Sequence, residues 1–261
     1  MSDLGGVNEV HGVLLEMGTL FHKICVKHSI PYYMLGGTML GAIRHKDIIP
    51  WDDDMDFGVP RKYWQMLHNV LNAELPDRYE VLTYKNADIN TDIIKINLKG
   101  SKLIYHGESQ DWGINIDLFP LDYADTNVGF FSANRLIWSL IMYNEIVHSN
   151  VRFRKKTVNL SCWLLRKINF IGKEPVIRFI EKHSYLKQND YTALANHYGI
   201  WGCKEVVPKD VMGTPKLYKF NKYEFYGVEN YDNYLKSLYG NYMQIPSPEN
   251  RHIHFDQVIL P

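Results

Sequence analysis

Cysteine is scarce in this chain, and its few cysteines do not form a familiar pattern. Cys25, Cys162 and Cys203 are far apart in sequence and odd in number. The absence of a C-x-x-C pair excludes the usual zinc ribbon and a disulfide-rich scaffold. A reducing compartment fits this cysteine usage best, so we expect a cytoplasmic protein.

Long hydrophobic runs and an excess of one charge are also missing. No stretch approaches the roughly 18 consecutive apolar residues of a membrane-spanning helix, and the N-terminus lacks a basic region followed by an apolar run, as a signal peptide would have. Lys plus Arg equals Asp plus Glu, 29 against 29. The net charge therefore indicates no polyanionic partner, and we expect no binding to nucleic acid. The chain is expected to be soluble or, at most, to lie on a membrane.

Positive charge is nevertheless concentrated locally. Residues 150–187 contain ten Lys or Arg and only Glu174 and Glu181 as acidic residues, and they include Trp163, Leu164 and other apolar residues. One interpretation is a solvated helical face. The other is a patch for anionic lipid headgroups or a lipid-linked substrate, which would make the protein peripheral at the inner face of the cytoplasmic membrane.

Hydrophobic periodicity predicts one compact α+β domain, since helix-like and strand-like segments are mixed along the chain. A helix is expected from Val10 to Cys25, short strands at 32–35, about 93–98 and 114–119, mainly helices over 130–187, and a loop-rich end. We divide the chain into three segments: 1–125 as the catalytic core, 126–200 as a helical and basic insertion, and 201–261 as a C-terminal segment that completes the site.

A glycine-rich turn precedes an acidic cluster. Thr38, after Gly36 and Gly37, is a plausible N-cap for a short helix, and backbone N–H groups of such a turn can receive a phosphate. The acidic cluster consists of four carboxylates within five residues, which repel one another unless a cation or several donors hold them. It comprises Asp52, Asp53, Asp54 and Asp56.

Period-two alternation from Asp52 onward predicts a strand that aims Asp54 and Asp56 the same way. An exposed, inert acidic turn is the alternative. A calcium loop of the EF-hand type is excluded, because Phe57 and Tyr63 stand where that loop needs Gly and Glu. Asp117, in the middle of a later apolar strand, is the natural third carboxylate. Oxygen-only ligands favour Mg²⁺ (or Mn²⁺) and metal-assisted phosphoryl transfer.

Three segments resemble the LicD family, which includes bacterial phosphocholine transferases and, more distantly, fukutin-type ribitol-phosphate transferases. They are 33–56, 113–122 and 231–243, the last followed by Pro246, Pro248, Arg251 and His254. The resemblance spans roughly residues 10–255, with a gap through 125–200. It implies a nucleotidyltransferase-type mixed sheet flanked by helices.

Carried over by position, the resemblance makes Asp54 and Asp56 metal ligands and Asp117 a ligand or base, with Asp52 a weaker candidate ligand. The expected substrate-binding residues are Gly36, Gly37, Thr38, Arg44, His45, Lys95, Arg251 and His254. Alternatives remain for three of these: Arg44 could salt-bridge the aspartates, Lys95 could be a surface lysine, and His252 with His254 could be a zinc pair.

The resemblance implies transfer of a phospho-alcohol, phosphocholine above all, from a CDP-alcohol to a sugar hydroxyl with release of CMP. The expected acceptor is a glycan or glycolipid: a surface polysaccharide, teichoic acid or lipopolysaccharide precursor. Tyr198 and Trp201 are candidates to hold a quaternary ammonium. Two other functions compete, an Asp-x-Asp glycosyltransferase using a UDP-sugar and a non-catalytic nucleotide-binding module of the same fold.

Overall fold

A mixed nine-stranded sheet forms the centre of the protein. The structure, a computed structural model, describes residues 5–105, 108–109, 113–148, 156–168, 171–251 and 255–261. The sheet contains β1 (Tyr33–Met34), β2 (Asp56–Pro60), β3 (Tyr79–Leu82), β4 (Ile94–Leu98), β7 (Asn115–Ala124), β8 (Ala193–Ala195), β9 (Val206–Pro208), β10 (Lys216–Phe220) and β11 (Tyr223–Gly227).

The strand order of this sheet is β10-β11-β1-β2-β7-β4-β3, with β8 paired to the end of β7 and β9 paired to β8. The pairs β1–β11 and β2–β7 are parallel, while the others are antiparallel. A separate three-stranded sheet joins β5 (Lys102–Tyr105), β6 (Glu108–Ser109) and β12 (Gln257–Ile259). The predicted α+β fold with a mixed sheet is therefore confirmed.

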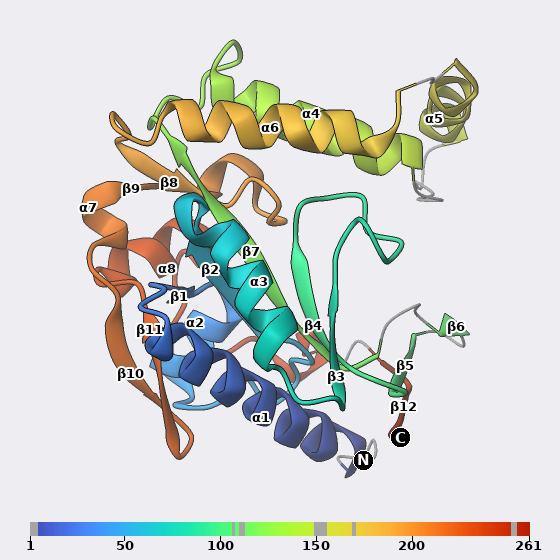
Figure 1. Cartoon of the computed structure of the whole chain (residues 1–261). Coiled ribbons are helices and arrows are strands. Elements are labelled where there is room, and N and C mark those ends of the chain that lie inside the picture. The colour runs from blue at the N-terminus through green and yellow to red at the C-terminus, as the bar shows by residue number, and fades with distance from the viewer. Residues whose placement is uncertain (1–4, 106–107, 110–112, 149–155, 169–170, 252–254) are drawn as a thin grey trace.

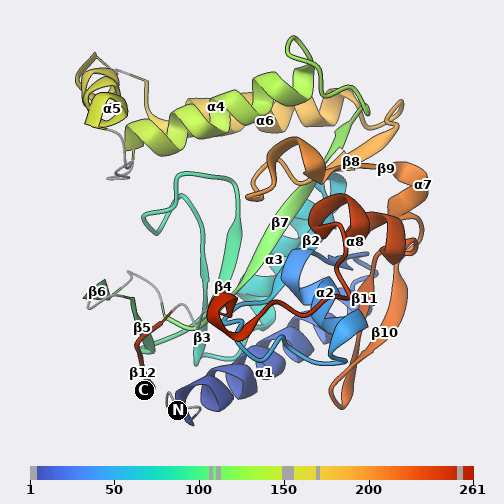
Figure 2. The same ribbon diagram turned by 180° about the vertical axis from the view of Figure 1, so that it is seen from behind.

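Helices cover the sheet from both sides and from one end. They are α1 (Gly5–Lys27), α2 (Gly36–Arg44), α3 (Trp64–Glu74), α4 (Ala133–His148), α5 (Lys156–Ile168), α6 (Lys173–Leu186), α7 (Lys209–Met212) and α8 (Tyr231–Tyr239). Three 3₁₀ turns lie at Arg61–Tyr63, Gly202–Glu205 and Pro248–Asn250. Figure 1 shows α1 and α3 in front of β2 and β7, and Figure 2 shows α2 and α8 on the reverse side.

The first helix shows how the sequence pattern builds the core. Its periodic apolar residues are buried, from Val10 to Ile24, as predicted. The ring of Phe21 packs 4.9 Å from that of Phe57 on β2, so α1 is held against the strand that carries the acidic motif. Burying each side chain of this size contributes about 1.5–3 kcal/mol. The same core cluster includes Val7 near the start of the chain and Phe255 near its end, so the first and last segments share one interior.

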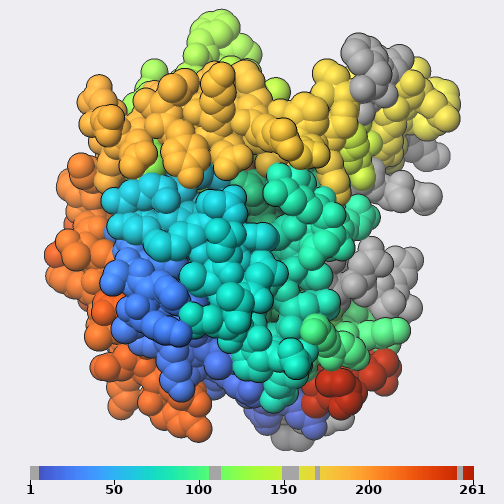
Figure 3. Space-filling model, in the orientation of Figure 1, coloured from blue at the N-terminus to red at the C-terminus, as the bar shows by residue number. Residues whose placement is uncertain are grey.

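The helical insertion forms a separate layer at the end of β7. Figures 1 and 2 show α4 and α6 side by side across that end, with α5 beyond the far end of the pair. Figure 3 shows α6 and α5, in orange and yellow, along the upper edge of this face of the molecule. A small apolar cluster that includes Ile141 and Ile180 joins α4 to α6.

A buried ion network ties this layer to the sheet, because His197 Nε2 lies 3.2 Å from Asn134 Oδ1 of α4 and the hydroxyl of Tyr185 on α6 donates to Arg61 O at 3.3 Å. Arg61, fully buried, pairs with Asp92 and with Asp122 on β7, and its Nε lies 2.8 Å from Asp122 Oδ1. Nδ1 of His197 donates to the other oxygen of Asp122 at 2.8 Å. Two cationic or donor side chains therefore surround one buried carboxylate, and the pKa of Asp122 is lowered even though burial alone would raise it.

Two local expectations were wrong. Strand β2 begins at Asp56, so Asp52, Asp53 and Asp54 lie in the preceding loop rather than within the strand. Helix α2 begins at Gly36 after Leu35 as N-cap, so Thr38 lies inside the helix. The cause is the main chain at Gly36, whose φ of +46° makes the sharp turn that starts the helix three residues early.

Candidate active site

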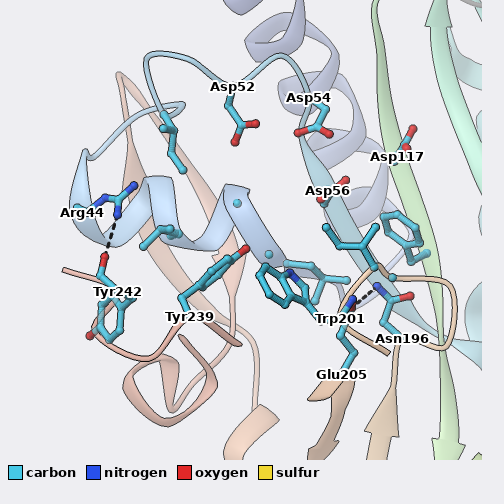
Figure 4. Close-up of a pocket in the computed structure, with 18 of the residues that line it drawn as sticks. Arg44, Asp52, Asp54, Asp56, Asp117, Asn196, Trp201, Glu205, Tyr239 and Tyr242 are labelled. Atoms are coloured by element: carbon cyan, nitrogen blue, oxygen red, sulfur yellow. Dashed lines mark hydrogen bonds between the residues drawn. The ribbon is translucent and has the colours of Figure 1, made fainter. Parts of the chain in front are cut away.

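A cavity of about 550 Å³ opens beside the acidic motif. Its wall comes from the β1–α2 turn, the loop before β2, the start of β7, the β8–β9 loop and the C-terminal segment. Figure 4 shows Asp52, Asp54, Asp56 and Asp117 along one side, with Tyr239 and Trp201 across from them. The structure thus brings the three aspartates predicted to be catalytic into one cavity.

Three residues form a row across the sheet at this wall. Asp56 on β2 is the register partner of Asp117 on the parallel strand β7, and Asp117 faces Lys95 on β4. Neighbouring strands lie about 4.8 Å apart, and residues in register share a face. Asp117 N–H also donates to Met55 O at 2.9 Å. The alternation of both strands therefore places Asp56 and Asp117 side by side, which a bare Asp-x-Asp pattern could not determine.

The carboxylates of Asp54 and Asp56 stand in an unfavourable electrostatic environment. Burial is the largest cause that raises the pKa of each well above its ordinary value, and neighbouring aspartates raise it further. The Asp54 side chain still meets solvent in the cavity, although protein atoms surround it closely on the other sides. Lys95 opposes the shift at Asp54. A bound cation would favour the charged form of both groups and so oppose these shifts.

Asp117 differs from the other two because a lysine already holds it. Lys95 Nζ lies 2.6 and 2.7 Å from its two carboxylate oxygens, and Asn115 Nδ2 donates to it at 2.6 Å. Lys95 is buried, with only 7% of its surface exposed, so the alternative of a surface lysine was wrong. A direct contact of Lys95 with phosphate stays a prediction.

The donor set fits a hard divalent cation held at an open wall. In the described ranges, no three His, Cys, Asp or Glu side chains form a preformed metal cage. Asp54, Asp56 and Asp117 therefore do not form such a cage by themselves, and metal binding there stays a prediction, in which Mg²⁺ would take one or two carboxylates and complete its shell with water and substrate phosphate. A closed structural zinc site is a different arrangement. The proposed zinc pair, His252 and His254, lies outside the described residues.

The glycine turn fits tightly against the carboxylates. A Cβ at Gly37 would lie 2.8 Å from Asp52 Oδ2, so a larger residue there would force the Asp52 carboxylate to shift. Gly36 N–H donates to the hydroxyl of Tyr234 at 2.9 Å. Thr38 is buried, and its Oγ1 accepts the N–H of Asp56 at 2.7 Å. Thr38 therefore positions Asp56, while a phosphate contact by Thr38 stays a prediction.

Basic side chains lie at the opposite end of the cavity from Asp117. Arg44 lines the cavity and donates to the carbonyl oxygens of Tyr242 and Gln244, at 2.9 and 3.4 Å. No ion pair joins Arg44 to an aspartate within the described ranges, so the salt-bridge alternative was wrong there. The pKa of Arg44 is lowered, first by burial and also by the charge of Arg251. Repulsion between two cations indicates a place for an anion.

Two further predicted residues lie just behind this end. The guanidinium of Arg251 sits 5.0 Å from the ring centroid of Trp51, which lines the cavity. His45 packs edge-on against the same ring at 5.7 Å, and burial, then Arg44 and Arg251, lower its pKa. Neither His45 nor Arg251 reaches the cavity wall itself, and His254 lies outside the described residues.

Some residues on the aromatic side of the cavity were predicted from the sequence, and others were not. Trp201 and Tyr198, both suggested from sequence, line it, and Tyr239 packs against Trp201 at 5.2 Å between ring centroids. Glu205 and Asn196 were missed, because no local motif marks them. Glu205 accepts the N–H of Trp201 and the amide of Asn196, at 3.0 and 2.7 Å, and so holds the β8–β9 loop closed on itself.

Residues 29–173 match the family model described as LicD/FKTN/FKRP, nucleotidyltransferase domain. The lipopolysaccharide cholinephosphotransferase LicD of Haemophilus influenzae is 29% identical over 265 residues, covering 94% of each chain. The human ribitol 5-phosphate transferase FKRP is 57% identical over 31 residues, 12% of this chain and 6% of that protein. An uncharacterised Rickettsia prowazekii protein is 50% identical over 38 residues, covering 15% of this chain and 14% of its own.

Proposed function

Because the chain belongs to the LicD/FKTN/FKRP nucleotidyltransferase-domain family, we propose that it is a cytoplasmic transferase of phospho-alcohol groups. The donor is a CDP-alcohol, phosphocholine is the favoured group, and the acceptor is a sugar hydroxyl of a surface polysaccharide, teichoic acid or lipopolysaccharide precursor. The names of the Haemophilus and human relatives, a cholinephosphotransferase and a ribitol 5-phosphate transferase, support this reaction class.

The observation that carries the proposal is the cavity wall itself. Asp56 and Asp117 stand in register on parallel strands, Asp54 joins them from the adjoining loop, and the N-terminus of α2 lies beside them. A helix N-terminus favours a negatively charged ligand. Carboxylates for a divalent cation, a helix terminus for phosphate and cations at the far end together match a diphosphate donor.

In this reaction the acceptor oxygen attacks the phosphorus that bears the alcohol. The bond from that phosphorus to the CMP oxygen breaks, and CMP leaves with the electron pair. Asp117 accepts the hydroxyl proton in our proposal, and Lys95 keeps its carboxylate oriented. Mg²⁺ or Mn²⁺ bound by Asp54 and Asp56, with Asp117 and Asp52 as further ligands, would neutralise diphosphate charge and orient the donor.

The aromatic side of the cavity favours choline as the alcohol. A quaternary ammonium is attracted to the faces of Trp and Tyr rings. Burial, then the charges of Asp56, Asp52 and Glu205, raise the pKa of Tyr239, so its hydroxyl lies in a field that would also attract a cation. Lys204 Nζ lies 5.4 Å from the Trp201 ring centroid, which shows the indole in contact with a cation.

The test is calorimetric titration with CDP-choline, CDP-ethanolamine, CDP-glycerol, CDP-ribitol and UDP-glucose, each with and without Mg²⁺. Metal-dependent binding of a CDP-alcohol, followed by CMP release when a glycan acceptor is added, is the expected result. Binding of UDP-glucose alone would instead make the protein a glycosyltransferase. Absence of binding by all five would favour a non-catalytic module.

A further inference from the structure

Exposed apolar side chains gather in the helical layer. Among the described residues, more than half of the large hydrophobic side chains that remain exposed lie between residues 128 and 186. Isolated exposed hydrophobics are normal, but a concentration in one layer indicates an interaction surface. This layer lies beyond the end of β7, and none of its described residues lines the cavity.

Helix α5 shows the feature most clearly, because one of its faces is anchored and the opposite one is open. Cys162 is buried, and Arg166 Nε, one turn later, donates to Ile146 O of α4 at 2.8 Å. On the other side, Leu160, Trp163 and Leu164 are 59%, 51% and 49% exposed. Their spacing of three and four residues places them on one helix face.

Charge distinguishes this face from an ordinary protein-docking groove. Lys167 is exposed and continues the same face one turn after Trp163 and Leu164. The surrounding sequence, 150–187, holds ten basic residues against two acidic ones, and one of those two, Glu174, pairs with Arg178. An apolar face rich in Leu and Trp, bordered by unbalanced positive charge, matches an anionic surface that has an apolar layer beneath it.

We propose that α5 binds in the surface plane of a membrane that contains anionic lipid. Leu160, Trp163 and Leu164 enter the boundary between headgroups and acyl chains, and Lys167 contacts lipid phosphates. The helix lies on the membrane rather than across it, since no helix among the described residues is long and apolar enough to span one. This proposal does not depend on the reaction proposed above.

Helix α6 extends the same surface. Phe179 and Leu186 are 43% and 72% exposed, and Lys182 is exposed between them at helical spacing. The helix is anchored on α4 by its buried side, through Val176 and Ile180. Apolar and basic side chains thus occur together on the exposed faces of two helices that both pack on α4.

The test is co-sedimentation of the full chain with phosphatidylcholine vesicles that contain phosphatidylglycerol, at low and high salt. Binding should be strong at low salt and weaker at high salt, because the lysines contribute screened attraction. The double variant Trp163→Glu and Leu164→Glu should bind about tenfold more weakly, since it removes the inserted apolar area. Lys167→Glu should lose a smaller part of the affinity.

Leu217→Glu is the matched control, because Leu217 is 48% exposed on the β10–β11 hairpin, away from α5. It should bind vesicles as the wild type does. Failure of the wild type to sediment at low salt would overturn the proposal, as would equal binding by the double variant. Equal binding to pure phosphatidylcholine would remove the role given to Lys167. Because Lys167→Glu leaves the apolar face intact, it keeps the test valid if the double variant does not fold.

Discussion

Strand β7 carries two aspartates in different electrostatic situations. Asp122, near its end, is paired with Arg61 and receives a hydrogen bond from His197, and its pKa is lowered. At the start of the strand, Asp117 borders Asp54 and Asp56, whose pKa values are raised well above the ordinary range. The carboxylate at one end of the strand is thus compensated by protein cations, whereas at the other end Lys95 holds Asp117 but the neighbouring carboxylates Asp54 and Asp56 remain crowded by like charges.

The difference separates a structural charge from one available for chemistry. The pairs around Asp122 are complete within the protein, and Arg61 is 0% exposed, so the network fixes the helical layer to the sheet. At the other end, Lys95 pairs with Asp117 and opposes the raised pKa of Asp54. A cluster that the fold leaves under-compensated destabilises the protein unless a ligand supplies positive charge, which is the usual cost of a functional site.

The largest expected effect is a loss of activity caused by changes near Asp117, at the start of β7. Asp56→Asn should lower CMP release by on the order of 10³-fold, because it removes a carboxylate at the reacting diphosphate. Without divalent cations it should leave stability unchanged or raised, since a like charge is removed. Activity assays and denaturant melts of the same sample measure both. The control is Asp77→Asn at an exposed position, and full activity in Asp56→Asn would contradict the assignment.

At Asp122, near the end of β7, the main effect of a substitution should instead be a loss of stability. Asp122→Asn leaves Arg61 buried without one of its carboxylates, and breaking such a pair costs about 3–5 kcal/mol of unfolding free energy. The stability that Asp122 contributes is present above its unfolded pKa and lost as pH falls through its lowered folded pKa. The variant should therefore differ most from the wild type near neutral pH. A loss under about 1 kcal/mol in chemical denaturation would show that the network is not what holds the layer.

Glu205 is an intermediate case, because neutral donors hold it. Its carboxylate accepts from Trp201 N–H and Asn196, and burial raises its pKa to about 7. A raised folded pKa means that the native state binds the proton more tightly, so stability should fall as pH rises from about 4.5 to 7. Glu205→Gln should remove that fall, by at most about 3 kcal/mol. The comparison is made by denaturant melts at several pH values with a chelator present, and equal pH slopes would refute it.

The sequence predicted the carboxylates around Asp117 but not the ion network around Asp122. Asp54, Asp56 and Asp117 lie in segments with specific motifs, and alternation placed Asp117 in a strand. The register that aligns Asp56 with Asp117 and Lys95 is a tertiary property. Arg61, Asp92 and His197 are separated by 31 to 136 positions and have no local pattern. Pairing between such distant residues leaves no periodic signal, so the network appears only in the folded chain.

The sequence also failed to predict the residue at which strand β2 begins. The acidic run reads as a strand from Asp52 because its alternation is regular, yet pairing with β7 starts only at Asp56. The loop before it is held instead by its own contacts, for example Asp52 N–H donating to Ile49 O at 2.9 Å. The period-two pattern of the acidic run therefore predicted correctly which side chains face the cavity, but it did not predict where the strand begins.

The smallest expected effect tests whether the uncompensated charge selects a cationic substrate. Trp201→Ala should weaken binding of CDP-choline about tenfold, because a desolvated cation–π contact contributes up to about 2 kcal/mol. CDP-glycerol, which has no cationic headgroup, should lose little. Lys222, at the tip of the β10–β11 hairpin, lies over the Tyr223 ring at 5.3 Å, so Tyr223→Ala is the control that removes an aromatic ring from a cation–π pair elsewhere. Equal losses for both nucleotides would mean that Trp201 shapes the cavity without recognising charge, and the negative field of Glu205 and the aspartates would then act on the metal alone.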